Sequence, residues 1–293
     1  MNRADGSPKI AEYWSLLENN GVQCLLCPHK CKILENMAGK CTVRENHGGI
    51  LLASSYGHVS SIALDPIEKK PLYMFMPGTK ILSIGGFGCN FHCPYCQNYE
   101  ISLEYETRQR NTKIMTPTDI VILAKETVCD SNIGIAYTYN EPLVGYDFVR
   151  DTAQLAHASV LSNVLVTNGY INPEPLESLL PVIDAMNIDL KSFSPDFYKR
   201  VGGDLETVKN TIKLSHKHCH VEVTTLVIPG ENEDSIEELA RWLSSIDPEI
   251  PLHLSRFFPR YNYSGKSPTS PEVLYDLKET ARKYLKNVFV GNV

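Results

Sequence analysis

The stretch that decides the fold of this chain is residues 88–98, Gly-Cys-Asn-Phe-His-Cys-Pro-Tyr-Cys-Gln-Asn. It follows a short apolar segment, 80–85, and carries Cys89, Cys93 and Cys96 in a C-x3-C-x2-C pattern. Close spacing on one loop lets three thiolates converge on a soft metal centre, and a [4Fe–4S] cluster usually takes four cysteines. With no fourth cysteine nearby, one iron of such a cluster stays open to another ligand. The alternative is a zinc knot, but a structural zinc site needs four protein ligands, and no fourth is evident close to this loop.

The overall composition is that of a soluble globular enzyme. Of the 293 residues, 43% are hydrophobic and 21% are charged, and the net charge is −6, so there is no basic footprint for nucleic acid. No apolar run approaches membrane-spanning length, and residues 1–8 contain no apolar core of a secretory signal. We therefore expect a cytoplasmic protein that binds neither nucleic acid nor membrane.

A second group of cysteines lies near the N-terminus. Cys24, Cys27, Cys31 and Cys41 form a C-x2-C-x3-C-x9-C pattern. Cysteines in an intracellular chain are metal ligands or free thiols before they are disulfides. Four thiolates can close a tetrahedral site, and an all-thiolate set suits either zinc or an iron–sulfur cluster. We predict a second metal site here and leave its metal open.

The residues around this second group are expected to form a small Cys-rich region, 1–78. Apolar residues spaced along 9–20 predict one short helix. Residues 50–64 predict a β-hairpin that turns near Gly57. The proline-bounded segment 65–72 then connects this region to the rest of the chain, which we assign to a second domain, 79–293.

From residue 80 onward, predicted strands alternate with predicted helices, which indicates an α/β fold with a parallel sheet. Seven strands come close to a (β/α)8 barrel without completing one, and barrels carry their chemistry at the carboxyl ends of the strands. The predicted strands are 80–85, 133–139, 163–167, 185–190, 220–228, 251–257 and 287–291, and the predicted helices are about 116–128, 145–160, 173–181, 204–217, 234–246 and 271–285.

Polar side chains follow or end the predicted strands, as the barrel rule requires. Any one of them alone is more simply explained as a cap or a turn, since Asn-Gly and Pro-Gly are turn signals first. Six consecutive strand ends with polar groups, aligned with a cysteine loop on the first, are not explained by turns. The candidate site residues gathered in this way are Asn140, Glu141, Asn168, Asp189, Lys191 and Arg260.

The cysteine loop resembles the cluster loop of the radical S-adenosylmethionine (SAM) enzymes, and Tyr95 stands where that family usually has an aromatic residue. The chain is also similar to the pyruvate formate-lyase activating enzymes, and more closely to the radical SAM member of the AmmeMemoRadiSam system. This resemblance implies a partial (β/α)6-type, TIM-like barrel. The segments that carry it are 24–31, 66–73, 89–98, 137–142, 167–169, 187–191 and 256–261.

The resemblance implies a set of cofactor contacts. Cys89, Cys93 and Cys96 would hold a [4Fe–4S] cluster whose open iron binds the methionine end of SAM. The family's usual Gly-Gly-Glu-Pro is replaced by residues 138–142, so Asn140 or Glu141 is the expected partner of the SAM amino group.

Further contacts to SAM are expected from the later strands. Val166 stands where activating enzymes often carry an acidic residue for the ribose, which makes Asn168 the expected substitute. Lys191 would pair with the SAM carboxylate, because an ammonium and a carboxylate form a strong charge-assisted hydrogen bond. Asp189 would bind a ribose hydroxyl or fix Lys191, and Arg260 would contact substrate or the SAM carboxylate.

The same resemblance implies reductive cleavage of SAM to a 5′-deoxyadenosyl radical that takes hydrogen from a substrate. An electron donor such as flavodoxin or ferredoxin and a protein substrate are the implied partners. The activating enzymes suggest a glycine in a partner protein, whereas the AmmeMemoRadiSam member leaves the target a protein or a small molecule. An alternative of another class is a non-catalytic iron–sulfur or zinc-binding protein that keeps the barrel.

Overall fold

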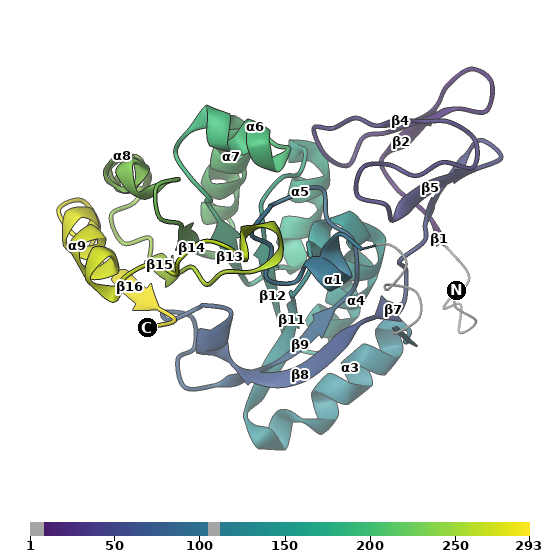
Figure 1. Cartoon of the computed structure of the whole chain (residues 1–293). Helices are drawn as coiled ribbons and strands as arrows, with labels where there is room; N and C mark the ends of the chain where they lie inside the picture. The colour runs from purple at the N-terminus through teal and green to yellow at the C-terminus, as the bar shows by residue number, and fades with distance from the viewer. Residues whose placement is uncertain (1–8, 105–111) are drawn as a thin grey trace.

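A computed structural model describes residues 9–104 and 112–293 of the chain (Figure 1). Its centre is one eight-stranded sheet in the order β16-β15-β14-β13-β12-β11-β9-β8. Seven of these strands are parallel to their neighbours, and β8 runs antiparallel to β9. The strands are β8 (Ser61–Pro66), β9 (Lys80–Gly85), β11 (Asn132–Tyr137), β12 (Ser162–Thr167), β13 (Ala185–Asp189), β14 (His220–Val227), β15 (Leu252–Arg256) and β16 (Val288–Gly291).

The parallel strands form because they are apolar on both faces and are followed by helices. In β9 every residue after Lys80 is buried, as expected of a strand covered on both sides. The helices follow the outside of the curved sheet in Figure 1. The predicted strands and helices from residue 80 onward are confirmed, with α3 (Pro117–Glu126), α4 (Tyr146–Ala158), α5 (Pro173–Leu179), α7 (Leu205–His216), α8 (Ile236–Ser244) and α9 (Pro271–Ala281).

Local signals explain where several of these helices begin. Thr116 and Asp119 form a capping box at the start of α3, with a proline at the first turn. Asp204 caps α7 by accepting from the Thr207 backbone N–H. Two short helices were not predicted, α1 (Tyr99–Ser102) and α6 (Pro195–Val201).

The sheet is an open, partial barrel because its two edge strands, β8 and β16, do not pair. This confirms the expected fold class, a partial TIM-like barrel, with seven parallel strands where the resemblance implied six. Strand β8 joins the sheet although it precedes the predicted domain boundary at residues 78/79. That boundary stays a prediction.

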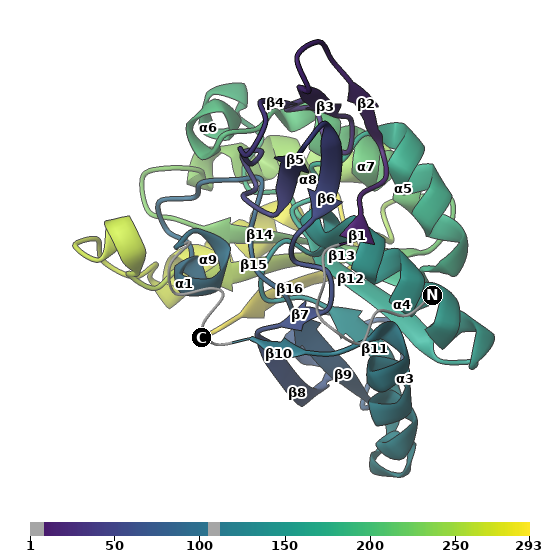
Figure 2. The same cartoon turned by 90° about the vertical axis from the view of Figure 1, so that its right-hand side faces the viewer.

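The N-terminal region contains two small sheets, which Figures 1 and 2 place at one end of the barrel beside α4 and α5. The Glu12 backbone N–H donates to Asp147 in α4, and the Asn172 backbone N–H donates to the carbonyl of Leu26. One sheet contains β2 (Trp14–Leu16), β3 (Val22–Cys24) and β4 (Lys32–Ile33), and the other β1 (Lys9–Ile10), β6 (Ile50–Ala53) and β5 (Arg44–His47).

The predicted helix over 9–20 is wrong. Residues 9–10 pair with β6 and residues 14–16 pair with β3. Tyr13, Asn19 and Asn20 have positive φ values of 55°, 55° and 57°, which a right-handed helix cannot contain. Strand pairing with distant partners overrides the helical spacing of the apolar side chains.

The predicted hairpin over 50–64 is also wrong. Strand β6 pairs with β5 and β1, β7 (His58–Val59) pairs with β10 (Lys113–Ile114), and β8 pairs with β9. Gly57 does turn the chain, at φ 78°, but the strands on its two sides leave for different sheets. The hairpin of this region is β5–β6, which turns through Gly48 and Gly49 at φ 59° and 81°.

Among the helices of the described residues, none is long and apolar enough to cross a membrane.

Candidate functional site

A cavity of about 350 Å³ opens at the carboxyl ends of the parallel strands. This size is within the range of sites for small molecules and cofactors. Its wall combines the cysteine loop after β9 with the ends of β11 to β15. The lining residues are Cys89, Phe91, Cys93, Tyr95, Cys96, Gln97, Asn98, Ser102, Thr138, Tyr139, Asn140, Glu141, Val166, Thr167, Asn168, Asp189, Lys191, Thr224, Leu226, Ser255, Arg256, Phe258 and Asn292.

The cysteine loop brings all three predicted thiols to this cavity, and none is in a disulfide. The loop is held open by local contacts: the Phe91 backbone N–H points to Cys89 Sγ at 3.3 Å, and the ring of Phe91 packs on Gly203. Burial raises the pKa of each thiol, Cys89 most clearly. A cation that joins the three thiols would favour their thiolate forms.

The three thiols suit a cluster better than a single ion. Among the described side chains, no group of three or more His, Cys, Asp or Glu residues could hold one metal ion. A [4Fe–4S] cluster makes a different demand, because its cysteine ligands bind separate irons around a larger core. The cavity, the three thiols and the lack of a fourth protein ligand fit a cluster with one open iron.

Asn140 and Glu141 both line the cavity, but their side chains are taken up by the protein. Asn140 accepts from the Gly86 backbone N–H at 2.9 Å and donates to the Gly88 carbonyl at 3.0 Å, which fixes the glycines that lead into the cysteine loop. The Glu141 carboxylate accepts from the Thr167 hydroxyl at 2.6 Å and the Asn168 N–H at 2.7 Å. Burial raises the pKa of Glu141 to about 7, although these hydrogen bonds oppose the shift.

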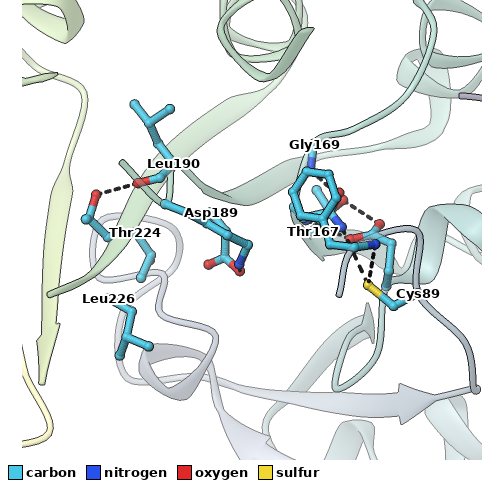
Figure 3. A network of polar contacts seen from close by, with 12 residues as sticks. Cys89, Thr167, Gly169, Asp189, Leu190, Thr224 and Leu226 are labelled. Atoms are coloured by element: carbon cyan, nitrogen blue, oxygen red, sulfur yellow. Dashed lines mark hydrogen bonds and ion pairs between the residues drawn. The ribbon is translucent and has the colours of Figure 1, made fainter. Parts of the chain in front are cut away.

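Asn168 connects the strand end to the cysteine loop. Its Nδ2 donates to Asn90 Oδ1 at 2.8 Å and lies 3.7 Å from Cys89 Sγ, while its Oδ1 accepts from the Tyr170 N–H at 2.9 Å. Figure 3 shows Cys89 and Thr167 close together on one side of the network, with Asp189 and Leu226 on the other. The amide of Asn168 thus positions a cysteine as well as facing the cavity.

Asp189 and Lys191 lie together at the end of β13, with Lys191 Nζ 3.0 Å from Asp189 Oδ2. Burial alone would lower the pKa of Lys191, but Asp189 and the nearby Cys93 hold it well above its usual value. Lys191 is therefore a cation facing the cavity. Both residues were predicted from their place at a strand end, and the structure brings both side chains to the cavity that the cysteine loop lines.

Tyr95 and Arg260 differ in their placement. Tyr95 is buried in the cavity wall, with its hydroxyl beside the Cys93 thiol. Arg260 is outside the cavity lining. Its guanidinium lies 3.7 Å from the Glu100 carboxylate and over the Tyr99 ring, beside α1.

Sequence reasoning missed Arg256, which lines the cavity at the end of β15 in place of Arg260. Its Nε donates to the Thr269 carbonyl at 2.7 Å. The strand-end rule could have selected Arg256, because it is the last residue of β15. Ser255, the residue before Arg256 in β15, was not singled out either. Phe258 and Asn292 also line the cavity, and they come from loops whose course the sequence does not indicate.

Glu222, two residues before Thr224 on the same face of β14, is not part of the cavity. It is fully buried and accepts from the Tyr73 and Met74 backbone N–H groups at 2.9 and 2.8 Å. His220 Nε2 lies 2.9 Å from its Oε1, and His253 Nε2 lies 2.5 Å from its Oε2. Burial would raise the pKa of Glu222, but these hydrogen bonds lower it to about 2, so it is a structural anion at the other end of the strand.

The four N-terminal cysteines surround a second, smaller cavity behind the cysteine loop. Apolar side chains and the fully buried Arg44 complete its wall. Burial raises the pKa of Cys24 and Cys41, and Arg44 partly opposes this at both thiols. The cavity is lined by Cys24, Leu26, Cys27, His29, Cys31, Ile33, Gly39, Cys41, Arg44, Asn90, Leu143, Val144, Tyr170 and Ile171.

Comparison with known proteins agrees with this geometry. The family model described as the Radical SAM superfamily matches residues 83–243. An uncharacterized protein of Methanocaldococcus jannaschii is 43% identical over 290 residues, which cover 97% of this chain and 85% of that protein. A second protein of this organism, named as a candidate glycyl-radical enzyme activating enzyme, is 28% identical over 71% of this chain and 87% of its own length.

Among solved structures, Streptococcus suis SuiB bound to S-adenosylmethionine has a TM-score of 0.53 at 12% identity. The match covers 70% of this chain and 48% of that one. At this identity the likeness concerns the fold alone.

Proposed function

This chain belongs to the radical SAM superfamily, and we propose that its larger cavity binds SAM and cleaves it reductively to abstract hydrogen from a substrate. Membership implies an enzyme that uses a [4Fe–4S] cluster and SAM. The single observation that carries the proposal is the meeting of three unpaired thiols, a partly buried cation and an aromatic residue at one cavity.

We assign Cys89, Cys93 and Cys96 as the ligands of the cluster. When bound, the cluster supplies the low-potential electron that breaks a C–S bond of SAM, giving methionine and a 5′-deoxyadenosyl radical. Asn140 and Asn168 hold the loop in the shape that presents the three thiols, through Gly86, Gly88 and Asn90.

The protein's own part is to bind and orient SAM. Lys191 is the cation available for the SAM carboxylate, and Asp189 keeps it charged and aimed at the cavity. Asp189 is the polar group best placed for the ribose, because the Asn168 amide already donates to Asn90 and accepts from the Tyr170 N–H. The Asn140 and Glu141 side chains already make hydrogen bonds within the protein. We therefore assign the amino group of SAM to the backbone edge of residues 138–140.

The expected substrate is a partner protein, with a flavodoxin or ferredoxin as electron donor. A hydrogen taken from a glycine of that partner would make the chain a glycyl-radical activating enzyme, which the names of some relatives favour. Arg256, Phe258 and Asn292 at the mouth of the cavity are placed to contact it. A small-molecule substrate remains the alternative, and a non-catalytic metal-binding protein is a further outcome of the test below.

The test begins with protein purified and reconstituted without oxygen. Addition of SAM and dithionite is expected to yield 5′-deoxyadenosine, and the Cys93→Ala variant is expected to yield none. The Cys129→Ala variant is a matched control, because this exposed cysteine is outside both cavities. A wild-type protein that contains its cluster but forms no 5′-deoxyadenosine would refute SAM cleavage and favour the non-catalytic alternative.

The activating-enzyme proposal needs a separate readout. A glycine radical on a partner would give an electron paramagnetic resonance doublet that changes when glycine is replaced by 2-deuterated glycine in that partner. Consumption of SAM without a protein radical would favour a small-molecule substrate.

We also propose that Cys24, Cys27, Cys31 and Cys41 bind a second metal centre, and that residues 1–78 form the region that carries it.

A further inference from the structure

The four N-terminal cysteines face a shared small cavity. All four line one cavity of about 20 Å³, somewhat more than the roughly 10–15 Å³ that one water requires. Its other walls are mostly apolar side chains, among them Leu26, Leu143 and Ile171. A cavity with this lining keeps water away from whatever the thiols bind.

A single zinc ion with four thiolates requires each sulfur about 2.3 Å from one centre. Within residues 9–104 and 112–293, no group of three or more potential ligands is arranged to hold one metal ion. The loop cysteines of the larger cavity are likewise not arranged around one ion, and the superfamily to which this chain belongs uses a cluster there. The N-terminal thiols share this property with them, which favours a cluster over one zinc ion.

A buried and incompletely satisfied arginine faces the same cavity. Arg44 is 1% exposed, its Nη1 pairs with Asp147 at 3.2 Å, and its Nη2 donates to the Glu12 carbonyl. Its Nε–H has no acceptor among the described residues, although it is buried. A buried N–H without an acceptor is costly, so this one points to a missing acceptor in the cavity that Arg44 lines.

Sulfur atoms are the acceptors that this group of residues can supply. Thiolate sulfurs accept N–H hydrogen bonds in zinc and iron–sulfur sites alike, and an iron–sulfur core adds inorganic sulfides as further acceptors. Gly39 packs closely on one of the four cysteines: a Cβ at this position would lie 3.6 Å from Cys31 Sγ and 3.3 Å from Ile33 Cδ1.

We propose that Cys24, Cys27, Cys31 and Cys41 ligate an iron–sulfur cluster, and that the Nε–H of Arg44 donates a hydrogen bond to it. The cluster would be distinct from the one at Cys89, Cys93 and Cys96. This assignment does not depend on SAM cleavage, because it concerns residues outside the larger cavity.

The metal content of two matched variants tests the ligand assignment. A variant with Cys89, Cys93 and Cys96 all changed to Ala is purified without oxygen, reconstituted with iron and sulfide in the presence of equimolar zinc, and desalted. We expect two or four irons with an equal amount of sulfide per chain, and a cluster signature in the Mössbauer spectrum. One zinc per chain without iron, or no bound metal in a chain that is folded by circular dichroism, would overturn the proposal.

The reciprocal variant, with Cys24, Cys27, Cys31 and Cys41 changed to Ala, separates the two sites. It is expected to lose only the additional iron. If it loses none, the N-terminal thiols carry no cluster, whether or not the protein cleaves SAM. Should this variant fail to fold, the wild-type protein decides the question: more than about four irons per chain supports the second cluster, and four or fewer contradict it.

The role of Arg44 is tested with Arg44→Lys in the background that lacks the loop cysteines. Lysine keeps a cation beside Asp147 but removes the Nε–H. Because hydrogen bonds to cluster sulfurs raise the reduction potential, the variant is expected to have a more negative potential. It is also expected to lose one exchangeable-proton coupling in electron–nuclear double resonance. Arg241→Lys, on an exposed face of α8, is the control, and an unchanged potential and coupling in Arg44→Lys would overturn the hydrogen bond.

Discussion

The two groups of cysteines in this chain use the same ligand atom in opposite surroundings. Cys89, Cys93 and Cys96 lie on the wall of an open cavity of about 350 Å³ that also presents Lys191 and Asp189. The four N-terminal cysteines face a small cavity whose other walls are mostly apolar. Three thiols and polar neighbours leave a position for a reactant, whereas four thiols and an apolar wall leave none. The surroundings, more than the ligands, distinguish a reactive centre from a protected one.

The two groups are nevertheless packed against each other. A Cβ on Gly88 would lie 2.6 Å from Val43 Cγ1 and 2.7 Å from the Cys41 carbonyl, and His29 Nε2 lies 2.8 Å from the Asn90 carbonyl. The cysteine loop is therefore built partly on the N-terminal region. We therefore expect some substitutions to disturb both cysteine groups and others to disturb only one.

The largest effect is expected for Gly88→Ala. Gly88 has φ 87°, and the added methyl group would collide with the Cys41 backbone, so both cysteine groups should be displaced. We expect loss of most iron from both sites and loss of 5′-deoxyadenosine formation, measured by iron analysis and product assay. The control is Gly86→Ala, whose Cβ would meet nothing closer than 3.6 Å. Retention of iron at the N-terminal cysteines would show that this group does not depend on the structure of the cysteine loop.

A second variant, Glu222→Gln, separates general stability from either metal site. At pH 7 the wild type should be more stable by roughly 3 kcal/mol, since the fold lowers the pKa of Glu222 from 4.5 to about 2. A lowered carboxyl pKa stabilises the fold above the unfolded-state pKa, so this advantage should shrink as the pH falls from 4.5 toward 2. Denaturant unfolding of both proteins at several pH values measures it, with the exposed Glu177→Gln as control. Both sites should keep their iron at pH 7. A stability advantage of the wild type that does not shrink in acid would contradict the lowered pKa of Glu222.

Lys191→Met acts on the open cavity alone. Removing a partly buried cation that pairs with a ligand carboxylate typically costs about 2 kcal/mol, so the Kd for SAM should rise roughly 30-fold. Equilibrium binding of SAM to the reconstituted protein measures this, and Lys199→Met on an exposed face is the control. Iron at the four N-terminal cysteines should be unaffected. An unchanged Kd would remove Lys191 from the SAM site.

The smallest effect is expected for Gly39→Ala, which acts on the N-terminal cavity alone. Its methyl group needs only a small shift of the Ile33 side chain, so a cost of about 1 kcal/mol is reasonable for mild overpacking. The N-terminal iron should then be lost to a chelator several-fold faster than in wild type, while the Kd for SAM stays the same. Gly265→Ala, with open space around its Cβ, provides the comparison. Equal rates of iron loss from Gly39→Ala and wild type would show that the N-terminal cavity accommodates the added methyl group.

The sequence predicted the barrel well because its elements follow local rules. Apolar strands, helix caps such as Thr116, and polar residues at strand ends are each visible within a few residues. The cysteine loop and the Asp189–Lys191 pair were found in this way, and the structure places both at one cavity.

The N-terminal region was predicted poorly because distant partners determine its structure. The segment 9–20 has helical spacing but pairs with β6 and β3, and residues 50–64 divide their strands among three sheets. The occupied side chain of Asn140 and the position of Arg260 could not be predicted either. Both depend on loop paths that bring residues far apart in sequence into hydrogen-bonding distance or away from it.

The contact of Gly88 with the Cys41 backbone has a consequence for how the protein matures. Because one segment forms a wall of the other site, ordering either centre with metal lowers the cost of ordering its neighbour. By linkage, loading of the two centres should be positively cooperative. A chain supplied with too little iron should then contain fewer half-loaded molecules than two independent sites would give, which native mass spectrometry of a partial reconstitution would resolve. Iron scarcity would favour complete molecules at the expense of half-assembled ones.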